Sequence, residues 1–270
     1  MQGSGRLTVV FTIVCFGIIS ISGCSEGGGV NIFSLEDDRA LGAKIAASIA
    51  SDPAQFPVLD SVQYHQAYAH LYALRDSILQ TGSVVHATDF NWEIAIIHQD
   101  TIVNAFCTPG GYIYVYTGLL QFVDNEAQLA GVLAHEMAHA DLRHSTDQLT
   151  KAYGISLLLN LIVGENGSAL AEVAANLTQL AFSRSDESQA DAFAVQYLCG
   201  TTYDASGAAG FFEKVQQDDS TQIPAFFSTH PNPDDRVAEI KEEAAQLQCT
   251  GTQTYQDSYR RFLSTLPEAK

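Results

Sequence analysis

The chain has 270 residues, and 46% of them are hydrophobic, which is enough to fill the core of one domain. Its formal net charge is −18 at pH 7, from 31 acidic and 13 basic side chains. Nucleic acids are bound by clustered Lys and Arg, so this charge argues against such a partner. We expect a single folded domain over residues 34–270.

The N-terminus predicts an export signal. One charge, Arg6, precedes an apolar stretch over residues 7–21. A membrane-spanning helix needs about 20 apolar residues, so this shorter stretch fits the core of a signal peptide covering residues 1–23. An uncleaved helical anchor is the alternative.

Residues 21–24, with the sequence Ile-Ser-Gly-Cys, resemble a bacterial lipobox. We therefore expect lipid attachment at Cys24 and a flexible tether over residues 24–33. Ser25 rather than Asp follows the cysteine, which in the enterobacterial sorting scheme indicates the outer membrane. The sequence thus predicts a lipid-anchored protein of the bacterial cell envelope, facing the periplasm.

Two helices are expected next. Ser34 followed by Asp37 is a capping arrangement that starts a helix ending near residue 50. Over residues 62–80, apolar side chains recur every three or four positions, which is typical of a core-facing helix. The histidines without ligand spacing, which we interpret as non-catalytic, are His65, His70, His86 and His98.

Three short strands are predicted over residues 92–97, 101–106 and 112–117, with a Pro-Gly-Gly turn between the last two. Tyr112, Tyr114 and Tyr116 share one face of the last strand. Packing within the sheet and contact with a substrate both stay open for them.

The next predicted helix contains the pattern His-Glu-x-x-His, with Asp124 or Asn125 as its cap. His135 and His139 are one turn apart on one face, so both can bind one metal ion. A catalytic zinc takes three protein ligands and a water, and Glu136 could deprotonate that water. A pair of solvated histidines on an ordinary helix is the alternative.

A third ligand must come from elsewhere, and its position separates the classes of zinc protease. The metzincin pattern would need Gly at position 142 and His at position 145. This chain has Leu142 and Ser145, with His144 one position out of register. The metzincin class is therefore excluded.

Two acidic residues further on fit better. Glu187 and Asp191 are four residues apart in a helix-compatible segment. One helix face can therefore offer Glu187 to the metal and Asp191 to the free ring N–H of a ligand histidine. A solvated acidic face is the alternative. Glu165 and Glu172 are rival ligands, but neither has an acid four residues later.

Residues 153–163 are very apolar, and residues 168–182 are rich in Ala and Leu. Each segment is too short to span a bilayer. A lid, a membrane-touching flap and ordinary helical core all stay open. Further helices are predicted over residues 185–198, 205–217 and 233–248.

Beyond the signal peptide and the anchor Cys24, the chain has three cysteines, Cys107, Cys199 and Cys249. An exported compartment permits disulfides, and Cys199 and Cys249 each follow a predicted helix, so we favour that pair. Cys107 would then be a small buried hydrophobe.

These motifs, in this order, are similar to those of the HExxH zinc endopeptidases, the family that includes HtpX, the CAAX prenyl proteases, the mitochondrial Oma-type protease and the periplasmic BepA and LoiP proteases. The resemblance covers about residues 35–247. The matching segments are residues 104–106, 109–120, 135–139, 183–191 and 228–236.

The resemblance implies an α+β fold, a mostly helical zincin-type metalloprotease domain with a small β-sheet whose edge strand borders the active-site cleft. It implies one Zn²⁺ per chain on His135, His139 and Glu187, with Glu136 as the general base. Asp191 and Arg236 would support the ligands from behind.

The resemblance also suggests that His230 lies close to the zinc, either in the open position of a latent state or as a contact for the substrate carbonyl. A structural turn at the His-Pro pair is the alternative. Residues 112–117 would lie at the lip of the site, where an extended substrate could add a strand. The substrate contacts that we predict are Asn104, Gly110, Gly111, Tyr112 and Tyr114.

The sequence therefore predicts a zinc metalloendopeptidase that cuts unfolded or misassembled envelope proteins, as part of protein quality control. The competing hypothesis is an envelope chaperone or assembly factor for outer-membrane proteins, with little or latent proteolysis.

Overall fold

The computed structural model describes residues 31–164, 166–217, 224–231 and 235–268. The predicted signal peptide and Cys24 lie outside the described residues. The elements are α1 (Leu35–Ala50), α2 (His65–Leu79), β1 (Glu93–Ile97), β2 (Ala105–Thr108), β3 (Tyr112–Tyr116), α3 (Thr117–Phe122), α4 (Glu126–Asp141), α5 (His144–Tyr153), α6 (Ile155–Val163), α7 (Gly167–Asn176), η1 (Leu177–Gln179), α8 (Arg184–Cys199), α9 (Gly207–Gln217), α10 (Pro224–Thr229), α11 (Arg236–Gln246) and α12 (Gln256–Leu263).

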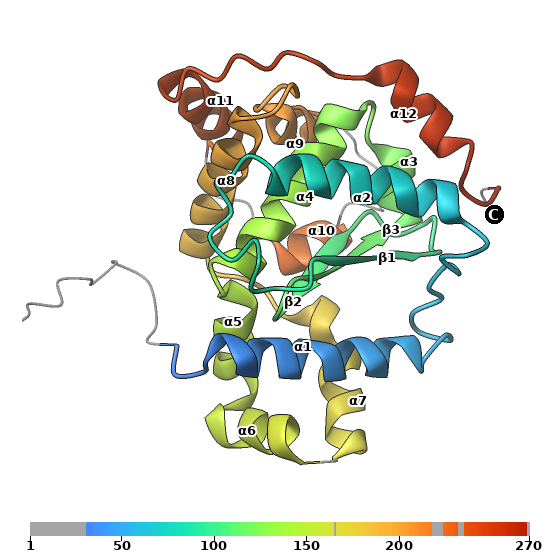
Figure 1. Ribbon diagram of the computed structural model, residues 1–270, viewed down its shortest axis with the longest axis vertical. Helices are drawn as coiled ribbons and strands as arrows, with labels where there is room; N and C mark the ends of the chain where they lie inside the picture. The colour runs from blue at the N-terminus through green and yellow to red at the C-terminus, as the bar shows by residue number, and fades with distance from the viewer. Residues whose placement is uncertain (1–30, 165, 218–223, 232–234, 269–270) are drawn as a thin grey trace, which may run out of the picture.

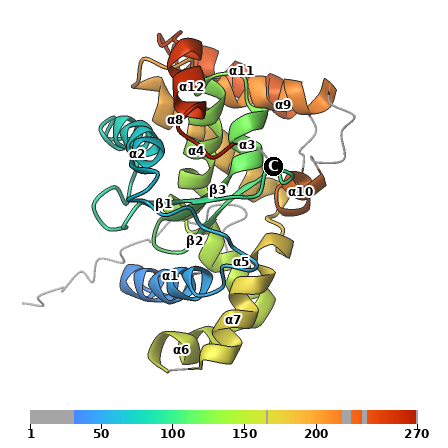
Figure 2. The ribbon, with the colours of Figure 1, turned by 90° about the vertical axis from the view of Figure 1, so that its right-hand side faces the viewer.

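A small mixed sheet lies between two helical layers. Figures 1 and 2 show α1, α6 and α7 on one side of the sheet, and α2, α4 and α9 on the other. The strand order is β1-β3-β2, with β1 parallel and β2 antiparallel to β3. The prediction of a mostly helical α+β domain is confirmed.

The position of residues 112–117 differs from the prediction. Residues Tyr112–Tyr116 form β3, and Thr117 begins α3. Because β3 pairs on both sides, it is the central strand, so a substrate cannot add to it as a further strand. All five residues of β3 are buried, as expected for a central strand. The edge strand that packs against α4 is β2, and it begins at Ala105 rather than residue 101.

The two faces of the sheet serve two cores. Ile113 and Val115 belong to the larger core with α4, whereas Tyr112, Tyr114 and Tyr116 belong to the smaller core with α1 and α7. Successive side chains of a strand point to opposite faces, which explains the separation.

The helix α4 lies at the centre of the larger core, and every one of its residues is buried. It approaches α9 so closely that a Cβ on Gly131 would lie 2.2 Å from the backbone nitrogen of Ala208. A helix that is buried all round must be largely apolar, so its charged and imidazole side chains require a specific partner.

The segment that could have been a lid packs on α1. Leu158, Leu161 and Val173 are buried there, and the Lys44 ammonium donates hydrogen bonds to the Leu161, Ile162 and Gly164 carbonyls at the end of α6. The inner face of this segment is therefore helical core. Its outer face exposes Ile155, Leu159 and Val163. Within the described parts of the chain, no helix is both long and apolar enough to cross a membrane.

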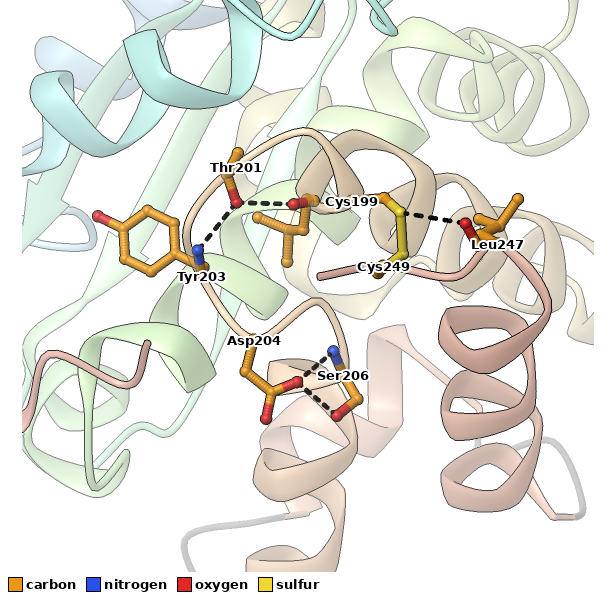
Figure 3. The surroundings of a disulfide bond; sticks show 8 residues. Cys199, Thr201, Tyr203, Asp204, Ser206, Leu247 and Cys249 are labelled. Carbon is orange, nitrogen blue, oxygen red and sulfur yellow. Dashed lines mark hydrogen bonds between the residues drawn. A yellow bond between two sulfur atoms is a disulfide. The ribbon is translucent and has the colours of Figure 1, made fainter. Parts of the chain in front are cut away.

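The structure contains the disulfide that the sequence favours. Cys199, at the end of α8, is bonded to Cys249, which follows α11 (Figure 3). Cys107 is a free, buried thiol.

Candidate metal centre

The two histidines of α4 point toward the same spot. The Nε2 atoms of His135 and His139 are 3.0 Å apart, and both side chains are buried. The helix begins at Glu126 because the Asn125 side chain accepts a hydrogen bond from the Gln128 N–H. Of the two predicted caps, Asn125 is the one that the structure uses.

Glu187 comes from the first turn of α8. Ser183 and Asp186 form a capping box that starts this helix and fixes the direction of its first turn. Glu187 Oε1 lies 3.4 Å from His139 Nε2, and Oε2 lies 3.5 Å from His135 Nε2. The carboxylate is 0% exposed, so it faces the imidazoles without competing water.

His230 joins this group from a third segment. It directly follows α10, and its Nδ1 lies 3.1 Å from Glu187 Oε1 and 3.4 Å from His135 Nε2. His135, His139, Glu187 and His230 each offer one ligand atom, and these atoms all lie within 4.8 Å of one another. His230 is therefore part of the cluster as well as of a turn.

The donor distances fit one zinc ion. Zinc binds nitrogen and carboxylate oxygen at about 2.0–2.1 Å, so donors at the corners of a tetrahedron lie about 3.3 Å apart. Five contacts among the donor side chains measure 3.0 to 3.5 Å, and one ligand atom from each of the four residues lies within 4.8 Å of the others, which is close enough for one ion.

The ring nitrogens lead to the same conclusion. His135 Nδ1 faces Asp191 Oδ1, and His139 Nδ1 faces His144 Nδ1, so the Nδ1 atoms of both ligand histidines can carry the ring proton. With the ring protons on Nδ1, the Nε2 atoms present lone pairs toward one point, as two ligands of one metal ion do. The side chains thus fit the predicted zinc.

Asp191 and Arg236 lie behind His135. Asp191 Oδ1 is 2.9 Å from His135 Nδ1, where it accepts the ring proton. Arg236 Nη2 donates to Asp191 at 2.7 Å and lies 3.1 Å from Glu187 Oε2. Burial disfavours a charged imidazole, but the hydrogen bonds to Asp191 and Glu187 outweigh it and raise the pKa of His135 to about 9. The acids therefore favour positive charge here, as a bound cation requires.

Glu136 lies beside the cluster, with Oε1 3.4 Å from His230 Nε2. Within the described chain, neither carboxylate oxygen of Glu136 has a hydrogen-bond partner. Burial raises the pKa of Glu136, although the neighbouring histidines oppose the shift. A buried carboxylate with free lone pairs and a raised pKa is suited to accept a proton. Burial also raises the pKa of Cys107, whose thiol interacts with Glu136, so Cys107 stays a neutral apolar group.

Asn104 lies next to the cluster. Its Oδ1 accepts a hydrogen bond from the Ala105 N–H of β2 at 2.9 Å, and the Thr229 hydroxyl lies 3.5 Å from the same oxygen. Thr229 precedes His230, so Asn104 connects the edge strand to the segment that presents this histidine.

The other four predicted substrate contacts lie in a turn or pack within the core. Gly110 and Gly111 adopt φ angles of 77° and 84° in the turn before β3, a conformation that favours glycine. Tyr112 and Tyr114 pack in the smaller core, on the sheet face away from α4. These surroundings match the sheet-packing alternative, and substrate contact by these four residues stays a prediction.

Two neighbours of the cluster were not predicted as site residues. Phe182 stacks on His139 with a centroid distance of 3.8 Å, and no local sequence signal marks it. The His144 ring also contacts His139, and the sequence showed His144 only as an out-of-register ligand. The rival ligand Glu172 is exposed on α7, whereas Glu165 lies outside the described residues.

The remaining histidines lie elsewhere. His70, His86 and His98 pair with acidic residues outside the cluster, as their lack of ligand spacing indicated.

Comparison with known proteins supports the same chemistry. The family model "Peptidase family M48" matches residues 71–244, which include all four donor residues. The mitochondrial metalloendopeptidase OMA1 of Arabidopsis thaliana is 32% identical over 168 residues, which are 60% of this chain and 34% of the relative.

Two bacterial relatives are similar over a comparable length of the chain. The beta-barrel assembly-enhancing protease of Escherichia coli (strain K12) is 32% identical over 186 residues, covering 63% of this chain and 38% of the relative. The metalloprotease YcaL of the same strain is 28% identical over 171 residues, covering 61% and 66%. The matches thus span from about a third to two thirds of these relatives.

Proposed function

Because this chain belongs to peptidase family M48, we propose that it is a zinc-dependent endopeptidase that hydrolyses peptide bonds of unfolded or misassembled proteins in the bacterial cell envelope. The observation that carries this proposal is the buried set of four donor side chains with Glu136 beside it. A protein that only binds polypeptides has no use for a carboxylate placed as a base at a metal site.

The chemistry assigns a role to each side chain. Zinc held by His135, His139 and Glu187 would polarise the scissile carbonyl and acidify a water molecule. Glu136 is placed to take the proton from the attacking water and to pass it to the leaving amine. Asp191 holds the His135 ring in the orientation that the metal needs. No acyl-enzyme forms by this route.

We propose that His230 keeps the enzyme latent. His230 would supply a fourth donor, and a zinc held by all four side chains would have no position left for water or substrate. Thr229, directly before it, is held by the Phe182 N–H, which donates to its carbonyl, and by Asn104. Activity would therefore require His230 to move away from the other donors.

The substitution Glu136→Gln tests the proposed hydrolysis. It should keep the fold and the zinc but lower cleavage of casein by roughly 10²–10⁴, because the base is lost. The Glu136→Gln substitution is made both in the unmutated chain and in the His230→Ala variant, so that latency does not hide the activity. Glu172→Gln, on the exposed face of α7, is the matched control. Undiminished cleavage by the Glu136→Gln variant would reject the assignment.

We propose that residues 1–23 are a signal peptide and that lipid on Cys24 anchors the chain to the outer membrane. The apolar stretch before Cys24 supports this placement, as does the disulfide, which requires an oxidising compartment. A bacterial relative is named as a β-barrel assembly-enhancing protease. Labelling with a radioactive fatty acid should mark the unmutated chain and Cys107→Ser but not Cys24→Ser. An unmutated chain that takes up no label would contradict the anchor.

The competing function is that of an envelope chaperone or assembly factor. The fourth donor, His230, favours it, because a zinc held by all four side chains would have no free position for peptide hydrolysis. Cells that lack the protein can be supplied with the Glu136→Gln variant and their envelope proteins compared. Full restoration of a normal profile would support the chaperone. Continued accumulation of misassembled proteins would support the protease.

A further inference from the structure

His144 makes a contact for which neither the sequence motifs nor the proposed chemistry accounts. It is the first residue of α5, it is 6% exposed, and its Nδ1 lies 3.1 Å from Nδ1 of His139. His139 presents its other nitrogen, Nε2, to the donor cluster. The contact is therefore on the side of the His139 ring that faces away from the metal position.

The chemistry of imidazole defines what this contact can do. A neutral imidazole has one proton, so a histidine that binds a metal through Nε2 carries that proton on Nδ1 and must donate it. The atom that faces His139 Nδ1 is the ring nitrogen of His144. We propose that His144 is a positioning residue. It accepts a hydrogen bond from the Nδ1–H of His139 and thereby fixes the orientation and tautomer of this ligand. The inference rests on the proposed metal site.

The backbone explains how His144 reaches this position. Arg143 adopts a left-handed conformation, with φ of 62°, between Leu142, which caps α4, and the start of α5. This residue ends one helix and starts the next at an angle, which brings His144 back toward the ligand five residues earlier. The Arg143 guanidinium is held by Asp38 of α1, so the turn is fixed from outside the site.

The other surroundings of His144 also belong to the metal-binding helices. Asp186 and Gln189 of α8 interact with the His144 ring, and they flank the ligand Glu187 in sequence. His144 is therefore enclosed between one ligand histidine and the helix that carries the ligand carboxylate. It is absent from the group of donor atoms that lie within 4.8 Å of one another, so its place is behind a ligand.

The two ligand histidines therefore have different hydrogen-bond acceptors for their Nδ1 protons. His135 has a carboxylate acceptor, Asp191, whereas His139 has an imidazole. In this chain, the histidine five residues after His139 is therefore not a third metal ligand. His144 is the hydrogen-bond acceptor for the Nδ1–H of His139.

The test compares two substitutions of similar size. His144→Leu removes the acceptor, whereas His144→Asn keeps a carbonyl oxygen that can accept the proton. We expect the zinc affinity, measured by titration against a chelator of known affinity, to fall about 10- to 100-fold with Leu and to recover largely with Asn. His65→Leu, a histidine exposed on α2, is the control and should keep the affinity of the unmutated chain.

Absorption of the cobalt-substituted proteins adds a second readout, because it reports ligand geometry rather than stability. Unchanged zinc affinity in His144→Leu would overturn the proposal, and so would an Asn variant as weak as the Leu variant. If the Leu variant does not fold, His144→Ala replaces it in the comparison. An unmutated chain that binds no zinc would instead reject the proposed metal site itself, so the two failures are distinct.

Discussion

At the scale of single residues, Arg236 links the supporting groups of the site. Its guanidinium is buried, donates to Asp191, lies close to Glu187 and packs over the Phe212 ring at 3.9 Å. A buried guanidinium is costly unless carboxylates compensate its charge. The acids at this site therefore serve two purposes, because they offset Arg236 and prepare the place for a divalent ion.

The substitution His230→Ala tests the role of the fourth donor. His135, His139 and Glu187 remain, and three protein ligands are enough for a catalytic zinc, so the variant should keep its metal. Because a coordination position becomes free, cleavage of casein should increase. Metal analysis and a peptidase assay on the same sample measure both effects. His65→Ala serves as the control, and complete zinc loss in the His230 variant would instead make this residue an obligatory ligand.

The residues that sequence analysis identified share a local signal. His135 and His139, like Glu187 and Asp191, are four apart on one helix, and helix geometry alone puts such pairs on one face. Phe182 and His144 could not be identified in this way, because their roles depend on how separate elements pack. The family resemblance supplied His230, which no spacing indicated.

At the scale of elements, the disulfide joins the two helices that support the site from one side. The helix α8 carries Glu187 and Asp191, and α11 begins with Arg236, which donates a hydrogen bond to Asp191 and forms an ion pair with Glu187. The bond between Cys199 and Cys249 lies at the opposite ends of these helices (Figure 3). It therefore stabilises their packing without touching the metal position.

Replacing both Cys199 and Cys249 by Ser should lower the free energy of unfolding. The bond closes a loop with a sequence separation of 50 residues, for which chain entropy gives about 4 kcal/mol. Urea unfolding with and without reductant measures the difference, and zinc content should not change. The double variant is its own control, since reductant should leave it unaffected. If reductant leaves the unfolding midpoint of the unmutated chain unchanged, this prediction is wrong.

The strands show where pattern reading reaches its limit. Alternation and turn residues located β1 and β3 to within a residue, and the Pro-Gly-Gly turn was correct. The order of the strands depends on how they pack in the sheet, so the sequence of each strand alone does not predict it. The family resemblance suggested residues 112–117 as the edge, whereas β3 is the central strand and β1 and β2 are the edges. The short helices α3, α5, α10 and α12 were also missed, because few residues define their periodicity.

At the scale of the whole molecule, the metal centre lies inside the domain, between the sheet and the helical layer. The donors come from α4, α8 and the residue after α10, which are far apart in sequence. All four are buried, so on the proposed function a substrate would reach them only after a rearrangement. The smaller core of α1, α6 and α7 covers the other sheet face and contributes no donor.

The central claim is that side chains from separate helices hold one zinc ion, and the zinc content of the purified chain tests it most directly. Elemental mass spectrometry should find one zinc per unmutated chain and one in Glu172→Ala, whose carboxylate is exposed on α7. It should find very little in the double variant Glu187→Ala/His230→Ala, which keeps only two of the four donors. A double variant that keeps a full equivalent of zinc would contradict the account.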